Sequence, residues 1–195
     1  MKILRSLLTV LALTLLATAP VRAAIDAPTP TGLKGDLLHS LDDAGSKLND
    51  LVQATPQDKL VWRPGEGVRS TAEVFLHVAG ANYMFPGLFG VKAPDGIDLK
   101  TLEKSTTDKA QVLKILNDSF GYARAAIQGV PDDGWDRQIQ MFGKPSTVRA
   151  ACLTMVTHMH EHLGQSIAYA RTNGIVPPWT ARAEEAAKQK KASGM

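Results

Sequence analysis

Apolar residues recur at helical spacing in four segments of the chain, and no segment alternates strongly enough to predict a long strand. The first segment covers residues 33–52, where leucines lie three, four or seven positions apart. The others cover residues 70–85, 107–128 and 146–173. Each segment would carry one apolar face, so the pattern predicts an all-α protein in which four amphipathic helices pack around a common core.

Short polar and glycine- or proline-containing sequences mark the ends of these helices. Ser70-Thr71-Ala72-Glu73 is a capping box, in which the serine and the glutamate satisfy each other's free backbone N–H groups. Pro86-Gly87 would end the second helix, and Gly129-Val130-Pro131 the third. Gly174 followed by Pro177-Pro178 would end the fourth. These signals predict where the second helix begins and where the second, third and fourth helices end.

Residues 1–23 have a different pattern from the rest of the chain. A basic start, Met1-Lys2-Ile3-Leu4-Arg5, precedes the apolar run 7–17, and Val21-Arg22-Ala23 fits a signal-peptidase site. The apolar run is too short to span a membrane, so we expect no stable membrane insertion. The segment predicts a secretory signal peptide cut after Ala23, and hence a secreted or periplasmic protein.

The expected signal peptide also changes the charge of the protein. The chain has 22 Lys and Arg and 19 Asp and Glu residues, and Lys2, Arg5 and Arg22 would leave with the signal. The mature chain would then have equal numbers of basic and acidic residues. It would have no row of basic residues of the kind that binds nucleic acid, so we expect no nucleic acid as partner. Cys152 is the one cysteine, which excludes an internal disulfide.

The 172 residues left after removal of the signal are enough for one domain with a proper core. We expect the helical bundle to cover residues 24–180. Residues 181–195 are rich in Ala, Glu and Lys and predict a frayed helix or disordered polar tail. Residues 138–142 alternate weakly and predict at most a brief extended piece.

Three of the five histidines lie within five positions of the fourth predicted helix. His158 and His162 are four residues apart, so their imidazoles stand on one face and can converge on one ion. His160 would point to the opposite side. A third ligand has to come from elsewhere, and the sequence offers His77 and His39. Spacing alone leaves open that these histidines are ordinary core or surface residues.

The second and fourth helices each carry a histidine on an otherwise apolar face. His77 lies among Val74, Val78 and Ala81 on the helical wheel. A buried imidazole without a partner is costly, so something must satisfy it. A shared metal ion would satisfy three histidines at once.

Two stretches of the chain resemble the DinB/YfiT-like metalloprotein superfamily. Residues 70–82 resemble the second helix of that family. Residues 158–165, continuing to Tyr169-Ala170-Arg171 and to residues 174–178, resemble its final helix, and Trp62-Arg63-Pro64 fits as well. The resemblance covers about residues 33–179. It implies an up-down-down-up four-helix bundle with a divalent metal on a histidine triad, His77, His158 and His162.

The resemblance also implies a chemistry. Relatives include thiol-cofactor-dependent transferases, maleylpyruvate isomerases and related hydrolases, and they often dimerise, so a homodimer is expected as well. Three neutral ligands leave coordination positions open for a water, a thiolate or a carboxylate. We expect a metal-dependent transferase or hydrolase, in which a divalent transition metal, Zn or Ni before Fe or Mn, activates a thiolate or water against a small-molecule electrophile. The alternative is a non-catalytic bundle that binds a metal or is stabilised by it.

Two residues near the histidines are candidates for catalytic roles. Gln165 lies one turn beyond His162 and could orient a bound water or ligand, or could form a helix–helix hydrogen bond instead. Glu161 is a candidate hydrogen-bond partner for a ligand histidine, or a solvated residue at the bundle edge. The sequence His160-Glu161-His162-Leu163-Gly164 lacks the second histidine of the HExxH motif, which excludes a zincin-type protease.

Overall fold

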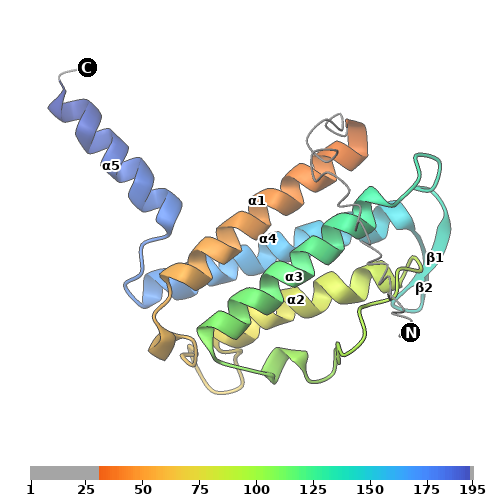
Figure 1. The fold of residues 1–195 in the computed structure, drawn as a ribbon, viewed down its shortest axis with the longest axis horizontal. Helices are drawn as coiled ribbons and strands as arrows, with labels where there is room; N and C mark the ends of the chain where they lie inside the picture. The colour runs from red at the N-terminus through yellow and green to blue at the C-terminus, as the bar shows by residue number, and fades with distance from the viewer. Residues whose placement is uncertain (1–30, 194–195) are drawn as a thin grey trace, which may run out of the picture. The chain divides into compact units, whose positions relative to one another are not determined.

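A computed structural model describes residues 31–193 of the chain, and the expected signal peptide lies outside these residues. Four long helices form a bundle: α1 (Gly32–Ala54), α2 (Thr71–Gly87), α3 (Lys109–Gln128) and α4 (Val148–Thr172) (Figure 1). Two single turns of 3-10 helix, η2 (Gln57–Lys59) and η3 (Leu102–Lys104), interrupt the connections. The all-α architecture is as predicted.

The helices are arranged so that α1 and α2 each pack against both α3 and α4. The end of α1 lies near the start of α3, because Gln57 accepts a hydrogen bond from the Lys109 backbone N–H at 2.9 Å. The end of α4 lies near the start of α2, because the Tyr169 hydroxyl donates to the Arg69 carbonyl at 3.2 Å. Helices α2 and α3 therefore run parallel to each other and antiparallel to α1 and α4, which is the up-down-down-up order (Figure 1).

The core is built from the apolar faces that the sequence pattern indicated. Helix α2 is the most enclosed, with 12 of its 17 residues buried. Helices α1 and α3 approach closely at Gly45, where an added Cβ would lie 2.9 Å from Phe120 Cδ1. The largest side chains below 2 % exposure include Leu41, Leu48, Phe75, Leu76, Leu116, Met155 and Met159. This core holds α2 and α4 rigidly side by side.

The start of α2 has the predicted capping box. Ser70 Oγ accepts from the Glu73 backbone N–H at 3.3 Å, and Glu73 Oε2 accepts from the Ser70 backbone N–H at 2.7 Å. The helix ends two residues later than predicted, because Pro86 and Gly87 form its last turn. A proline there removes one helical hydrogen bond without blocking the turn before it.

The segment between α3 and α4 contains a hairpin of which the sequence indicated only one arm. Strand β1 (Gln138–Met141) pairs antiparallel with β2 (Lys144–Thr147). Phe142 (φ 51°) and Gly143 (φ 78°) form the two-residue turn, and both positive φ values are typical of a type I′ turn. Strand β2 escaped prediction because it is short, polar and contains Pro145.

The C-terminal segment forms helix α5 (Pro178–Ala192), where a frayed helix or disordered tail was expected. The helix begins two residues before the expected domain limit at residue 180, with Pro178 at its first position. It has no buried residue, and Arg182 pairs with Asp50 of α1 at 2.9 Å. Within residues 31–193, none of the helices has the length and apolarity needed to cross a membrane.

Candidate metal centre

Two neighbouring helices bring the three predicted histidines together. His77 lies on α2, and His158 and His162 lie one turn apart on α4, which packs against α2. All three side chains are half-buried. One ligand atom from each lies within 4.8 Å of the other two, and no other such cluster occurs among residues 31–193.

The distances between the imidazole nitrogens fit one bound cation. His158 Nε2 lies 3.1 Å from His77 Nε2 and 3.2 Å from His162 Nε2. Zn–N bonds of about 2.0–2.1 Å, with angles of roughly 90–109° between them, separate the ligand nitrogens by about 2.9–3.4 Å. Without an ion or a shared proton, three nitrogen lone pairs at this distance would repel one another. The residues therefore fit a transition metal.

Hydrogen bonds on the far side of two rings orient these nitrogens. His77 Nδ1 lies 2.9 Å from Glu103 Oε2, and His162 Nδ1 lies 2.8 Å from Gln165 Oε1. Both oxygens accept, so each Nδ1 carries the proton and each Nε2 keeps its lone pair for a metal. His158 Nδ1 is buried and has no partner among the described residues.

The surroundings favour the neutral form of His77 and His158, which metal ligation requires. Burial, followed by the charges of the other two histidines and Arg69, lowers the pKa of His158 to about 4. Burial and the Arg69 charge also lower the pKa of His77, against the opposing effect of Glu103. At neutral pH little proton competition therefore remains for a metal ion at these nitrogens.

Glu103 is the partner of His77, and sequence reasoning did not find it. Its other oxygen accepts from Arg69 Nε at 2.8 Å. Burial alone would raise the pKa of Glu103, but hydrogen bonds from Arg69 and His77 outweigh it and lower that pKa below its ordinary value. The carboxylate is thus ionised between a cation and a ligand histidine. It lies on η3, in a connection without a recognisable motif.

A second chain of contacts starts at His162. Gln165, which accepts from His162, donates through Nε2 to the Tyr169 hydroxyl at 3.0 Å. Tyr169 in turn donates to the Arg69 carbonyl at 3.2 Å and packs edge-on against Trp62. The loop that carries Arg69 is therefore fastened to α4 beside the triad.

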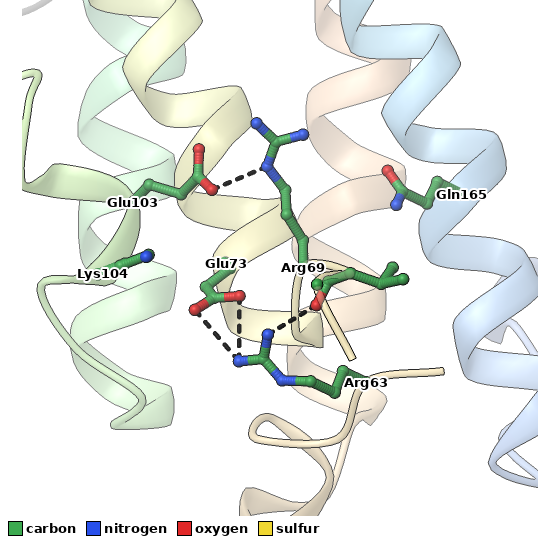
Figure 2. A pocket seen from close by; sticks show the side chains of 8 residues that line it. Arg63, Arg69, Glu73, Glu103, Lys104 and Gln165 are labelled. Atoms are coloured by element: carbon green, nitrogen blue, oxygen red, sulfur yellow. Dashed lines mark hydrogen bonds and ion pairs between the residues drawn. The ribbon is translucent and has the colours of Figure 1, made fainter. Parts of the chain in front are cut away.

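One cavity is lined by two of the three histidines, and a second is lined by the hydrogen-bond partners of His77 and His162. One, of about 190 Å³, is mainly apolar, and its lining includes His77, His158, Leu76, Ala81, Met84 and Leu99. The other, of about 530 Å³, is polar, with Arg63, Arg69, Glu73, Glu103, Lys104 and Gln165 around it (Figure 2). Glu103, the hydrogen-bond partner of His77, lines both cavities.

The other residues singled out from the sequence lie away from the triad. His39 is exposed on α1, and His160 is exposed with its Nδ1 2.8 Å from the Val156 carbonyl. Glu161 is exposed and lines a groove with Asp36 of α1, because its position on α4 turns it toward that helix. Its expected place beside a ligand histidine is taken by Glu103.

Cys152 is buried in the core, as expected for a small packing residue. Burial raises the pKa of its thiol to about 12. The thiol is therefore protonated at neutral pH and is not a nucleophile.

Comparisons with known proteins support this description of the fold. The model of the DinB superfamily matches residues 40–166. The structure is similar to that of a DinB-like protein from Bacillus cereus ATCC 10987, with TM-score 0.64, 17% identity, and 73% of this chain and 93% of that chain covered. No curated protein sequence matches the chain significantly.

Two structures from Bacillus subtilis are similar at 19% identity and TM-score 0.58. The match to the DinB-like protein YjoA covers 72% of this chain and 93% of YjoA. The match to YfiT covers 73% of this chain and 89% of YfiT. YfiT is described as a probable metal-dependent hydrolase with an unusual four-helix bundle topology. The match of the family model over most of the bundle, together with these folds, identifies the chain as a member of the DinB superfamily.

Proposed function

We propose that this protein is a metal-dependent hydrolase or transferase that acts on a small molecule. The observation that carries the proposal is the convergence of three Nε2 atoms, His77 and His162 at 3.1 and 3.2 Å from His158. A divalent ion held by these nitrogens would supply Lewis acidity and lower the pKa of a water or thiol that binds to it. The description of YfiT as metal-dependent supports a metal role in this fold.

Two observations favour an enzyme over a metal ion that only stabilises the bundle. The cluster has three protein ligands, and the described residues add no fourth, so coordination positions remain for a substrate or water. A cavity of about 190 Å³ is lined by His77 and His158, and a cavity of about 530 Å³ is lined by Glu103 and Gln165, the hydrogen-bond partners of two of the histidines, whereas a structural ion is normally closed off by protein. Both features are expected of a site that exchanges ligands.

The residues around the triad have positioning roles in this proposal. Glu103 and Gln165 accept from His77 and His162 and so aim their Nε2 atoms at one point. We place Gln165 among the groups that also face the reacting molecule, because it lines the polar cavity. Leu76, Ala81 and Met84 exclude water on the apolar side.

For the metal itself, nitrogen-only ligation favours Zn or Ni over Fe or Mn, which bind carboxylates more readily. Residues 24–195 should be expressed without a histidine tag, and bound metals quantified by elemental analysis. We expect about one equivalent of transition metal, lost in His77→Ala and in His162→Ala and retained in the control His39→Ala. A folded protein without metal, even after reloading, would overturn the metal centre.

Catalysis needs its own experiment. The loaded protein, the metal-stripped protein and the reloaded protein should be compared on esters, lactones, amides and thiol–electrophile pairs. We expect a turnover that stripping abolishes and reloading restores. A metal-loaded protein inactive on all classes would support the non-catalytic bundle instead.

The proposal places the protein outside the cytoplasm, on the strength of residues 1–23. Expression of the full chain with its native start, followed by fractionation and mass measurement, tests this. We expect a mature form beginning at Ala24 in the periplasm or medium. A cytoplasmic product that retains Met1 would overturn export. Size-exclusion chromatography with light scattering tests the expected homodimer.

A further inference from the structure

The polar cavity beside the triad carries two sets of unused hydrogen-bond donors. Arg63 is occupied, because its Nη2 pairs with Glu73 at 3.3 Å and its Nη1 donates to the Val68 carbonyl at 2.6 Å. Arg69 uses only Nε, toward Glu103, and its Nη1 and Nη2 have no acceptor within residues 31–193. Lys104 forms no ion pair in that part of the chain either. Figure 2 draws Arg69 and Lys104 among the side chains that line this pocket, on either side of Glu103.

The charges in this cavity leave an excess of positive charge. Three basic side chains face two acidic ones. Glu73 and Glu103 each already pair with an arginine, so Lys104 has no neutralising partner among the lining residues. A divalent ion at the adjacent triad would add to this excess. The cavity therefore suits an anion, and a monoanion matches the excess of its own side chains.

Arg69 is unusually well held for a side chain that is 39% exposed. Its side chain is fixed through Glu103 to His77, and its backbone carbonyl through Tyr169 and Gln165 to His162. A guanidinium whose Nε is engaged still presents its two terminal nitrogens as a fork, which matches the two oxygens of a carboxylate. The fork is thus placed beside the triad before any ligand arrives.

We propose that this cavity is the subsite for a carboxylate group of the substrate, bound by the terminal nitrogens of Arg69 and by Lys104. The apolar cavity lined by Leu76, Met84 and Leu99 takes the apolar part of the same molecule. The substrate class is then a small amphipathic carboxylate, a refinement that rests on the proposed function. Glu103 lines both cavities, so a molecule long enough to reach past its side chain would contact both.

Isothermal titration calorimetry with phenylacetate tests the subsite directly. Phenylacetamide has nearly the same shape without the charge, and phenyl phosphate carries a different anion. We expect phenylacetate to bind, and phenylacetamide to bind at least about tenfold more weakly, as expected for the loss of a charge-assisted hydrogen bond. Equal binding of the amide, no binding of phenylacetate, or a clear preference for phenyl phosphate would each overturn the proposal.

The variants locate the site. Arg69→Gln and Lys104→Gln should each weaken phenylacetate binding by about tenfold or more. Lys144→Gln, at an exposed lysine of β2, is the matched control and should leave it unchanged. Arg69→Gln also removes the ion pair with Glu103. The variant Arg69→Lys is therefore included, because it keeps a positive charge but lacks the two terminal nitrogens of the guanidinium. Unchanged affinity in the Arg69 and Lys104 variants would overturn the assignment.

Each titration is repeated on protein stripped of metal and dialysed free of chelator, which separates this inference from the proposed function. Phenylacetate binding that survives stripping and depends on Arg69 supports the subsite even if no metal chemistry exists. Metal binding without any Arg69-dependent carboxylate binding overturns the subsite and leaves the metal centre standing.

Discussion

Replacement of Glu103 by glutamine tests whether the metal affinity of the triad depends on the hydrogen bonds behind it. Glu103 accepts from His77 Nδ1 at 2.9 Å through one oxygen and from Arg69 Nε at 2.8 Å through the other. Glutamine has one carbonyl oxygen, so it can serve one donor only and turns an NH₂ group toward the other. His77 would then lose either its partner or the negative charge of that partner.

The expected cost follows from the geometry. Loss of the residue that orients a metal-bound histidine weakens metal affinity by about 10- to 100-fold, or about 1.4–2.8 kcal/mol. The upper part of this range is expected, because the partner of His77 is a carboxylate that is only 29% exposed. The variant should still fold, since Glu103 lies on a single turn of 3-10 helix outside the bundle core.

The assay is a competitive titration of Zn²⁺ against a chromophoric chelator at constant pH. Glu161→Gln is the matched control, because Glu161 is an exposed glutamate of α4 close in sequence to two ligands. We expect an unchanged affinity for Glu161→Gln. A Glu103→Gln protein that binds Zn²⁺ with full affinity would refute the reasoning. A Glu161→Gln protein with reduced Zn²⁺ affinity would also refute it, and would indicate that Glu161 supports a ligand histidine.

Three further predictions concern the bundle. Cys152 should resist thiol reagents in the folded protein at about pH 8 and react after denaturation, because burial raises its pKa to about 12; rapid labelling of the native protein would contradict this. Gly45→Ala should destabilise by about 1 kcal/mol in urea unfolding, since the close contact with Phe120 outweighs the gain in helix propensity; a stabilised variant would show that the ring can move. The hydrogen bond from the Ser70 backbone N–H, and to a lesser extent the contacts with Arg63, lower the pKa of Glu73. The Glu73 carboxylate therefore stabilises the fold at pH values above its ordinary pKa, and this stabilisation is lost as the pH falls through the lowered pKa. Glu73→Gln should therefore cost stability at about pH 7 and lose that cost toward about pH 3, and a pH-independent difference would count against the capping role.

The three histidines of the candidate metal centre could be found from sequence because each carries a local signal. The spacing of His158 and His162 places them on one face of a helix. His77 is a polar residue on an otherwise apolar helical face, where a buried imidazole needs a partner. The up-down-down-up order came from family resemblance and not from periodicity. Periodicity gives helices, but it does not say which helices run parallel.

The residues around the ligands could not be found in this way. Glu103 lies 26 positions from His77 and 34 positions from Arg69 in the sequence, and neither Glu103 nor Arg69 belongs to a periodic segment. Their partnership depends on how the long connection from α2 to α3 folds back over the bundle, which is a tertiary property. Strand β2 was missed for a related reason, because its pairing with β1 and not its composition makes it a strand.

The network around Arg69 has a consequence that neither the metal centre nor the carboxylate subsite has alone. The guanidinium of this arginine is tied to His77 through Glu103, and its backbone carbonyl is tied to His162 through Tyr169 and Gln165, so an anion that draws the guanidinium would change the support of His77. Binding at the two places is then linked, and linkage is reciprocal: whatever factor the carboxylate contributes to metal affinity, the metal contributes to carboxylate affinity. If both sites bind as proposed, a cation at the triad and a carboxylate at Arg69 would attract each other, so we expect a positive coupling. The charge at Arg69 is therefore better understood as part of the metal centre than as surface charge near it.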